Sequence, residues 1–435
     1  MPADSDIPRR VRNSILVAFA LLFIGVGWST VYRAGLGDRE RTDFTVYHAA
    51  GRAIIEGTPL YEAQNVRGWL YMYLPVFAVL MVPLAVLPKT LAAGVFYLLS
   101  LAALLHMTWI SARMAEARAG PSRWGVFATA VAILLLTGWP WMSGLTRGQA
   151  SVILSWLIIV SIDCFLRERR GSIGLRWAGA FALALATAIR IFPVVLGLWL
   201  LLRRKWEAAL ACVVAGVALT LVFPAAVFGP MGNMQLLVEW VTTIALPTGD
   251  AAAEGNARYE QMMDPRIVKN QSVQAVLVRW FAPSEEAGAD AREALARRIA
   301  AGVNAGLVVA TLAACLAGAW RRRGDDEQLP LIQACAFIML LVLIPPVAWV
   351  HNFSVVMLPL ALAVARSGRG GGDRLYAPAA LLWLSAATLC FVPLVYWAGG
   401  YLVGGLALWA AIVIDLLRGG SRGGAAVGLA GHEPA

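Results

Sequence analysis

Residues 41–61 read RTDFTVYHAAGRAIIEGTPLY and lie between two strongly apolar regions. Small and apolar residues cover most of the helical surface that this stretch would form. The polar residues Thr45, His48, Arg52 and Glu56 recur at helical spacing and form one narrow stripe. The pattern predicts a helix that lies at a membrane surface and does not cross it.

The ends of this helix are marked by residues with strong backbone preferences. Gly57 suits a left-handed C-terminal cap and Pro59 prevents continuation, so we expect a helix over about 43–56. Asp43 then stands at its first turn. A carboxylate there satisfies free backbone N–H groups and the helix dipole whether or not it has another role, so local sequence alone favours capping for Asp43.

The composition of the chain excludes an ordinary soluble domain. Mean hydropathy is +0.69, and 60% of the 435 residues are hydrophobic. These values indicate many membrane spans, so we predict an all-α polytopic membrane protein. The net charge of +10 comes mostly from Arg and Lys in connecting loops. It indicates membrane topology and not nucleic-acid binding.

Arginine-rich loops predict the orientation of the chain. Three arginines before residue 13 precede a first span at about 14–32, which places the N-terminus in the cytoplasm and Asp43 outside. Thirteen hydrophobic segments would leave the basic C-terminus outside, so we expect one segment within 73–110 not to span. About twelve crossings remain. Other loops expected in the cytoplasm lie at 167–176, 203–205 and 321–323.

The chain is predicted to form one integral membrane domain over residues 1–420. Its N-terminal apolar run lacks a small-residue cleavage site and is expected to be a retained span. We expect a first outer loop at about 33–72 and a second at about 229–275. Residues 421–435 are expected to form a disordered cytoplasmic tail.

Polar residues that interrupt apolar runs converge on the predicted outer face. A charged side chain inside a bilayer costs roughly 2.5–3.5 kcal/mol on insertion scales, so such residues are functional candidates. They are Asp43, residues 147–149, Arg190, residues 270–272 and His351.

A resemblance to a known family begins at Asp43. The groups Asp43-Phe44-x-Val46-Tyr47, Gly57-x-Pro59-Leu60-Tyr61 and Tyr73-Leu74-Pro75 resemble the start of the polyprenol-phosphate-sugar-dependent glycosyltransferases of family 87. These are membrane enzymes of the C-type glycosyltransferase superfamily, in which an aspartate of the first outer loop is the proposed base. The resemblance extends to Pro359. It implies a C-type bundle of about 12 transmembrane helices with an outer-face juxtamembrane helix. It also favours a catalytic role for Asp43 over helix capping.

The resemblance also implies a phosphate site. Arg190, in ATAIRIFPVV, stands where the family has a basic residue before a proline, and its guanidinium matches phosphate oxygens. A structural arginine that neutralises a helix end or pairs with an acidic neighbour is an equal alternative. The pair Trp349-x-His351, followed by Pro359, is similar to a late outer-face motif of the family. It implies that His351 contacts the donor phosphate or sugar.

Amide and phenol side chains complete the expected substrate contacts. Gln149, in TRGQASVIL, and Asn270 and Gln271, in KNQSVQAVL, look like recurrent family positions. Their amides would hydrogen-bond sugar hydroxyls or cap the following helices, and local sequence favours capping. Tyr47 and Tyr73 belong to the motif that begins at Asp43 and are expected to contact substrate.

The resemblance implies an inverting glycosyltransferase in a bacterial plasma membrane. It would move a sugar from a polyprenyl phosphate to a lipid or glycan acceptor hydroxyl on the extracytoplasmic side. Mannose is the first expectation for this sugar, and arabinose also lies within the resemblance. No cofactor or metal is expected, because the predicted outer face has no D-x-D, H-x-x-E or C-x-x-C motif and the chain has no phosphate-binding glycine-rich loop with lysine.

One rival is a transporter or flippase of lipid-linked sugars, which inverted repeats would favour. The other rival, a membrane scaffold, leaves the outer polar cluster unexplained.

Overall fold

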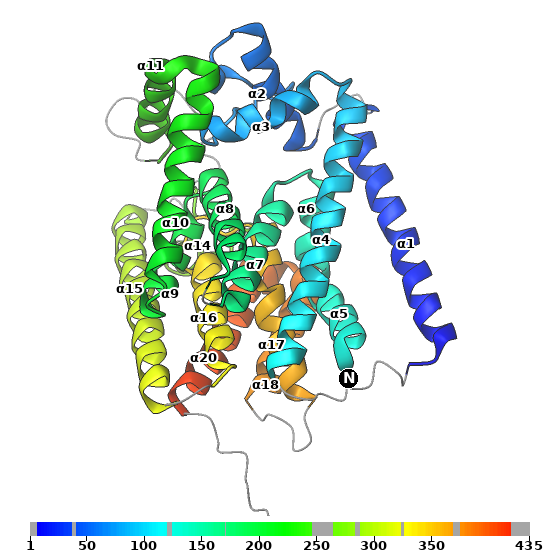
Figure 1. Ribbon diagram of the computed structural model, residues 1–435, viewed down its shortest axis with the longest axis vertical. Helices are drawn as coiled ribbons and strands as arrows, with labels where there is room; N and C mark the ends of the chain where they lie inside the picture. The colour runs from blue at the N-terminus through cyan, green and yellow to red at the C-terminus, as the bar shows by residue number, and fades with distance from the viewer. Residues whose placement is uncertain are drawn as a thin grey trace, which may run out of the picture.

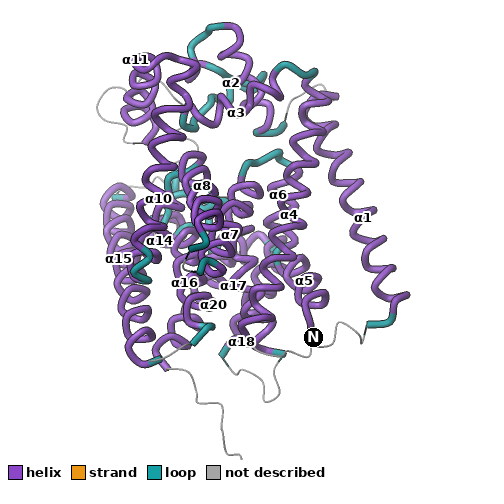
Figure 2. The backbone as a smooth tube through the Cα atoms, viewed as in Figure 1, coloured by secondary structure: helices purple, strands orange, loops and turns teal. Residues whose placement is uncertain are grey.

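The computed structural model describes residues 7–36, 41–119, 124–169, 171–245, 264–282, 288–322, 326–368 and 375–418. Within these ranges the chain is helical, and its only extended pairings are two isolated bridges, Gln64–Leu70 and Asn270–Trp349. The all-α prediction is confirmed (Figure 2). The predicted tail at 421–435 lies outside the described residues.

The first half of the chain contains α1 (Arg9–Val31), η1 (Tyr32–Leu36), α2 (Phe44–Glu56), η2 (Leu60–Glu62), α3 (Pro75–Ala85), α4 (Lys89–Ala119), α5 (Gly125–Leu136), α6 (Gly138–Thr146), α7 (Ser151–Arg167), α8 (Ile173–Ile189), η3 (Phe192–Val195) and α9 (Leu196–Leu202). The second half contains α10 (Trp206–Val217), η4 (Ala218–Val222), α11 (Phe223–Trp240), η5 (Val241–Ala245), α14 (Val273–Phe281), α15 (Ala289–Arg321), α16 (Leu329–Leu343), η6 (Val350–Val356), α17 (Met357–Ser367), α18 (Tyr376–Thr388), η7 (Leu389–Phe391), α19 (Pro393–Trp397) and α20 (Gly400–Arg418).

Several of these helices are long and apolar enough to cross a membrane. Six helical runs among the described residues qualify, and the pair α5–α6, bent by 66°, would make a seventh. Other apolar helices are shorter, such as α8 with 17 residues and α16 with 15. The multi-pass prediction is confirmed, whereas the number of about twelve crossings stays a prediction. The six runs are Arg9–Leu36, Lys89–Arg118, Trp206–Ala245, Ala289–Arg321, Val350–Ser367 and Gly400–Arg418.

The region 73–110 contains one short and one long helix. With 11 residues, α3 is about 16 Å long at 1.5 Å per residue and cannot cross a hydrocarbon core of about 30 Å. It packs against α2 at one end of the molecule (Figure 1). A Cβ atom on Gly51 of α2 would lie 2.8 Å from the Ala85 Cβ of α3, so glycine permits the close approach. The segment α3 therefore fits the expected non-spanning piece.

The surface helix has the predicted bounds. Its C-terminal cap, Gly57, has a φ of 69° and donates its backbone N–H to the carbonyl oxygen of Ala53. The helix packs against α3 and α4, at the end of the molecule opposite the start of α1 and the end of α20 (Figure 1).

The second outer loop expected at about 229–275 stays a prediction as to its side of the membrane, and its first part, residues 229–245, is helical. Gly229 has a φ of 73°, which bends the chain, and the helix resumes at Pro230 and continues through α11 and η5. Asn233 Nδ2 donates to the carbonyl oxygens of Thr220 and Leu221 across this bend. Glycine and proline therefore mark a kink here and not a helix end. Residues 246–263 lie outside the described ranges.

A buried ionic cluster fastens the last helix at the other end of the bundle. Asp415 of α20 accepts from Arg322 and from the Tyr376 hydroxyl, each at 2.8 Å, and pairs with Arg366 at 3.2 Å. All four residues are buried. Buried charges are tolerated only when paired and hydrogen-bonded, so this cluster fixes how α15, α17, α18 and α20 meet.

Candidate functional site

A cavity of about 620 Å³ lies between α2 and the helix bundle. Residues from distant parts of the chain meet on its wall. Besides apolar side chains, the wall includes the predicted site residues Asp43, Tyr47, Tyr73, Gln149, Arg190 and His351.

The turn between α6 and α7 is docked against the start of α2. The backbone N–H of Asp43 donates to the carbonyl oxygen of Arg147 at 2.8 Å. Gly148 has a φ of 59°, and a Cβ atom there would lie 2.7 Å from the Cβ of Phe44. Both the left-handed backbone and the close approach require glycine. This contact places Gln149 beside Asp43.

The carboxylate of Asp43 takes part in a polar chain and does not cap α2. The Asp43 backbone is already helical, with φ −70° and ψ −24°, and its side chain makes no capping hydrogen bond. Instead Gln149 Nε2 donates to Asp43 Oδ2 at 2.5 Å. Capping is therefore wrong for Asp43. It is also wrong for Gln149, since α7 begins at Ser151 and Ala150 is its N-cap.

Two phenols continue this chain along the wall. The Tyr47 hydroxyl donates to Gln149 Oε1 at 3.4 Å and lies 3.0 Å from the Tyr73 hydroxyl. Burial, with Tyr73 and the Asp43 carboxylate nearby, raises the pKa of Tyr47 well above its usual value. Tyr47 therefore stays protonated and remains a hydrogen-bond donor.

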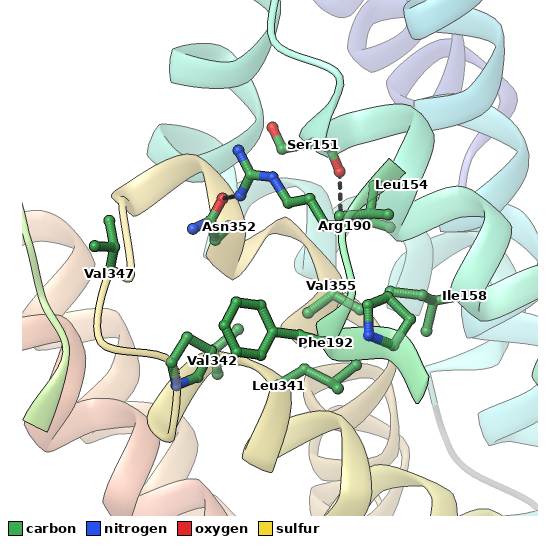
Figure 3. A pocket seen from close by; sticks show the side chains of 13 residues that line it. Ser151, Leu154, Ile158, Arg190, Phe192, Leu341, Val342, Val347, Asn352 and Val355 are labelled. Atoms are coloured by element: carbon green, nitrogen blue, oxygen red, sulfur yellow. Dashed lines mark hydrogen bonds between the residues drawn. The ribbon is translucent and has the colours of Figure 1, made fainter. Parts of the chain in front are cut away.

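Arg190 supplies a positive charge to the same cavity. It ends α8 with an extended backbone, φ −143° and ψ 132°. Its Nη1 donates to Asn352 Oδ1 at 2.6 Å (Figure 3). Tyr73, Tyr47 and Asp43 all lie within electrostatic range of the guanidinium. Because Asn352 is a neutral amide, its hydrogen bond leaves the positive charge of Arg190 available to an anion.

His351 presents an unsatisfied nitrogen at the cavity wall. The side chain is only 5% exposed, and its Nε2 atom has no hydrogen-bond partner among the described residues. Buried polar atoms are nearly always hydrogen-bonded in folded proteins. An orphaned ring nitrogen on a cavity wall therefore indicates a ligand position.

An apolar recess of about 50 Å³ adjoins the cavity at Arg190 (Figure 3). Arg190, Phe192 and Val347 line both spaces. The site thus presents a cation directly beside an apolar surface. Half of the remaining lining residues are aliphatic: Leu154, Ile158, Leu341, Val342 and Val355.

Asn270 and Gln271 do not line the cavity, contrary to the sequence prediction. Asn270 Nδ2 donates to the Pro346 carbonyl at 3.0 Å, and its Oδ1 accepts from the backbone N–H of Ala348 at 2.9 Å. Gln271 Nε2 donates to the carbonyls of Val268 and Tyr396. Because both amide nitrogens donate to backbone carbonyls, the two side chains stabilise the loop that precedes His351 and do not reach the cavity. The cap of α14 is the next residue, Ser272, whose hydroxyl accepts from the N–H of Ala275.

Sequence reasoning missed several wall residues. Asn352, the partner of Arg190, directly follows His351, and Trp349 belongs to the pattern that singled out His351. Trp240 lines the cavity from α11, a segment predicted to be loop. No group of three or more His, Cys, Asp or Glu side chains suited to a metal occurs in the described part of the chain.

Comparison with known proteins identifies one family. The model of glycosyltransferase family 87 matches residues 71–345. The matched range contains Tyr73, Gln149 and Arg190 but neither Asp43 nor His351, and the roles of all five residues stay predictions.

Two curated relatives carry the same description, polyprenol-phosphate-mannose-dependent alpha-(1-2)-phosphatidylinositol mannoside mannosyltransferase. The protein from Mycobacterium tuberculosis is 28% identical over 50% of this chain and 52% of its own length. The protein from Mycolicibacterium smegmatis is 28% identical over 45% of each chain. The chain thus spans about half the length of the curated relatives it matches.

Among solved structures, ArnT from Cupriavidus metallidurans bound to undecaprenyl phosphate is similar, with a TM-score of 0.40 and 13% identity over 93% of this chain and 77% of that one. A similarity at this level assigns no role to any residue of this chain.

The docked turn gives a stability prediction. Gly148→Ala should lower the free energy of unfolding by about 1–3 kcal/mol, because alanine disfavours the left-handed backbone and its Cβ meets Phe44. Thermal unfolding in lipid nanodiscs measures this loss. Gly174→Ala, in the first turn of α8 with nothing within 4 Å, is the control and should be neutral or stabilising. Equal unfolding temperatures for the two variants would contradict the docking.

Proposed function

Because the chain belongs to glycosyltransferase family 87, we propose that it transfers a sugar from a polyprenyl phosphate to an acceptor hydroxyl. The observation that carries the proposal is that Asp43, Arg190 and His351 all line the same cavity. A carboxylate, a guanidinium and an unsatisfied imidazole nitrogen are the groups that a glycosyl transfer from a phosphate donor needs.

The donor phosphate is placed at Arg190. A guanidinium beside an apolar recess suits a phosphate whose ester oxygen carries an isoprenoid chain. His351 Nε2 would hydrogen-bond the phosphate or the donor sugar. Arg190 stabilises the negative charge that develops on the departing polyprenyl phosphate.

Asp43 is the proposed general base. The acceptor oxygen attacks the anomeric carbon of the donor sugar, and the bond from that carbon to the phosphate oxygen breaks. The acceptor proton passes to the Asp43 carboxylate, and the bond electrons leave with the polyprenyl phosphate. A single displacement of this kind inverts the anomeric centre.

The proposed donor sugar is mannose and the acceptor is a lipid or glycan hydroxyl. The names of the two curated relatives support mannose. The test is incubation of purified protein with radiolabelled polyprenyl phosphomannose and a fractionated lipid or glycan acceptor pool. Mannosylated acceptor and released polyprenyl phosphate should appear in equal amounts. Movement of intact donor across vesicles without chemical transfer would identify a flippase instead.

Asp43→Asn separates proton transfer from structure. The variant should lose at least about 10²-fold in transfer rate while donor binding persists, since asparagine accepts hydrogen bonds but cannot take the proton. Stability should hardly change, because the Asp43 side chain caps no helix. Asp290→Asn, in the first turn of α15, is the control and should keep full activity. Near-normal turnover in folded Asp43→Asn would exclude the base role.

Arg190→Ala should sharply raise the KM for donor. Arg190→Lys should restore it only in part, because lysine keeps the charge without the planar fork of donors. Steady-state kinetics with donor titrated at saturating acceptor measures both variants. Unchanged donor kinetics in folded Arg190→Ala would rule out a phosphate contact.

We place the cavity on the extracytoplasmic side of the plasma membrane, supported by the arginine content of the opposite loops. A cysteine introduced at exposed Gln64, in a cysteine-free background, should react with an impermeant maleimide in intact cells. A cysteine at exposed Arg169 should react only after permeabilisation. The reverse pattern would invert the topology.

A further inference from the structure

A second polar space lies on the other face of α2. It is a groove of about 630 Å³, as large as the reaction cavity, and no residue lines both spaces. Its walls come from α2, the segment 58–66 and the start of α4. They include the polar stripe of α2, which the transfer mechanism leaves unused: Thr45, His48, Arg52 and Glu56.

The groove has a buried floor of hydrogen-bonding groups. Thr45, His48 and Asn65 are each 7% exposed or less. Asn65 Nδ2 donates to the Thr45 hydroxyl at 3.0 Å, and His48 Nε2 lies 3.2 Å from the Leu87 carbonyl oxygen. These hydrogen bonds join α2 to Asn65 and to the segment before α4, so they fix the shape of the groove floor.

The rim of the groove carries balanced charge. Arg52, Lys89, Glu56 and Glu62 all line it, and Arg52 pairs with Glu56 on the same helix. Glu56 and Glu62 would repel an anion, whereas Arg52 and Lys89 would repel a cation. An uncharged ligand with many donors and acceptors fits this lining best.

The groove and the reaction cavity are joined by shared elements. One face of α2 lines the cavity with Asp43, and the next face lines the groove from Thr45, about 3 Å further along the helix axis. Residues 63–73 fold back through the Gln64–Leu70 bridge. One arm of this turn lines the groove and the other, at 70–73, lines the cavity.

We propose that this groove binds the uncharged, polyhydroxylated part of the acceptor, a glycan portion remote from the reacting hydroxyl. Its assignment to the acceptor rests on the proposed function, whereas glycan binding itself does not. The groove would hold the remote sugars while α2 presents Asp43 to the reacting hydroxyl.

Equilibrium binding of a soluble α-linked mannose disaccharide tests the site without any donor. The full chain in nanodiscs should bind it, and Arg52→Gln and Glu62→Gln should each raise the Kd about tenfold, the effect expected for loss of a charged hydrogen bond. Arg297→Gln is the matched control. Arg52 and Arg297 are 51% and 46% exposed, and each pairs with a glutamate four residues away. The control should bind like the unaltered protein.

Three results would overturn the proposal: no binding of the disaccharide, equal affinity in groove and control variants, or tighter binding of a sulfated disaccharide. A kinetic arm then ties the groove to transfer. The groove variants should lose more kcat/KM with a two-sugar acceptor than with a one-sugar acceptor, and an equal loss for both would refute the acceptor role. Disaccharide binding without any transfer would refute the proposed function and leave the glycan site standing.

Discussion

The contact between the 146–150 turn and the start of α2 is the constraint on which the site depends. A short surface helix does not cross the membrane, so only contacts with the helix bundle can fix its position and rotation. Two contacts fix both: the hydrogen bond from the Asp43 N–H to the Arg147 carbonyl, and the close approach to Phe44 that Gly148 permits because it has no Cβ. One turn of the bundle thereby sets both the position of the helix and the partner of its carboxylate.

The polar residues of the site are held by one another more than by secondary structure. Gln149 has two distinguishable ends, and its amide donates to Asp43 while its oxygen accepts from Tyr47. Since neither contact is interchangeable, the amide can adopt one orientation only. Asn270 acts similarly on the loop before His351, with its oxygen and nitrogen both bonded to backbone. Neutral amides therefore position the charged groups and add no competing charge.

The sequence predicted elements with local causes and failed where partners were distant. Helix α2 could be predicted because its signals, the helical periodicity and the residues Gly57 and Pro59, all lie within residues 41–61. The cap assigned to Asp43 was wrong because its partner, Gln149, comes from a turn more than a hundred residues away. Asn270 and Gln271 were assigned to substrate because an amide in an apolar sequence has the same pattern whether it binds a ligand or a backbone. The second outer loop was expected from its polar residues, and its helical part at 229–245 was not predicted, because polarity excludes a membrane span but not a helix.

In the proposed mechanism, one face of α2 serves the reaction and another binds the glycan. Reaction at Asp43 needs a dry, partly apolar cavity, in which charges interact strongly. Holding a glycan needs the opposite, an open lining of matched donors and acceptors that replaces the hydration of many hydroxyl groups. A helix can separate the two demands, because residues two apart, such as Asp43 and Thr45, point to nearly opposite sides of it. The alternation of apolar and polar faces that predicted a surface helix is thus the same pattern that separates the two spaces. Fixing α2 through Gly148 would set the catalytic carboxylate and the glycan groove in one step.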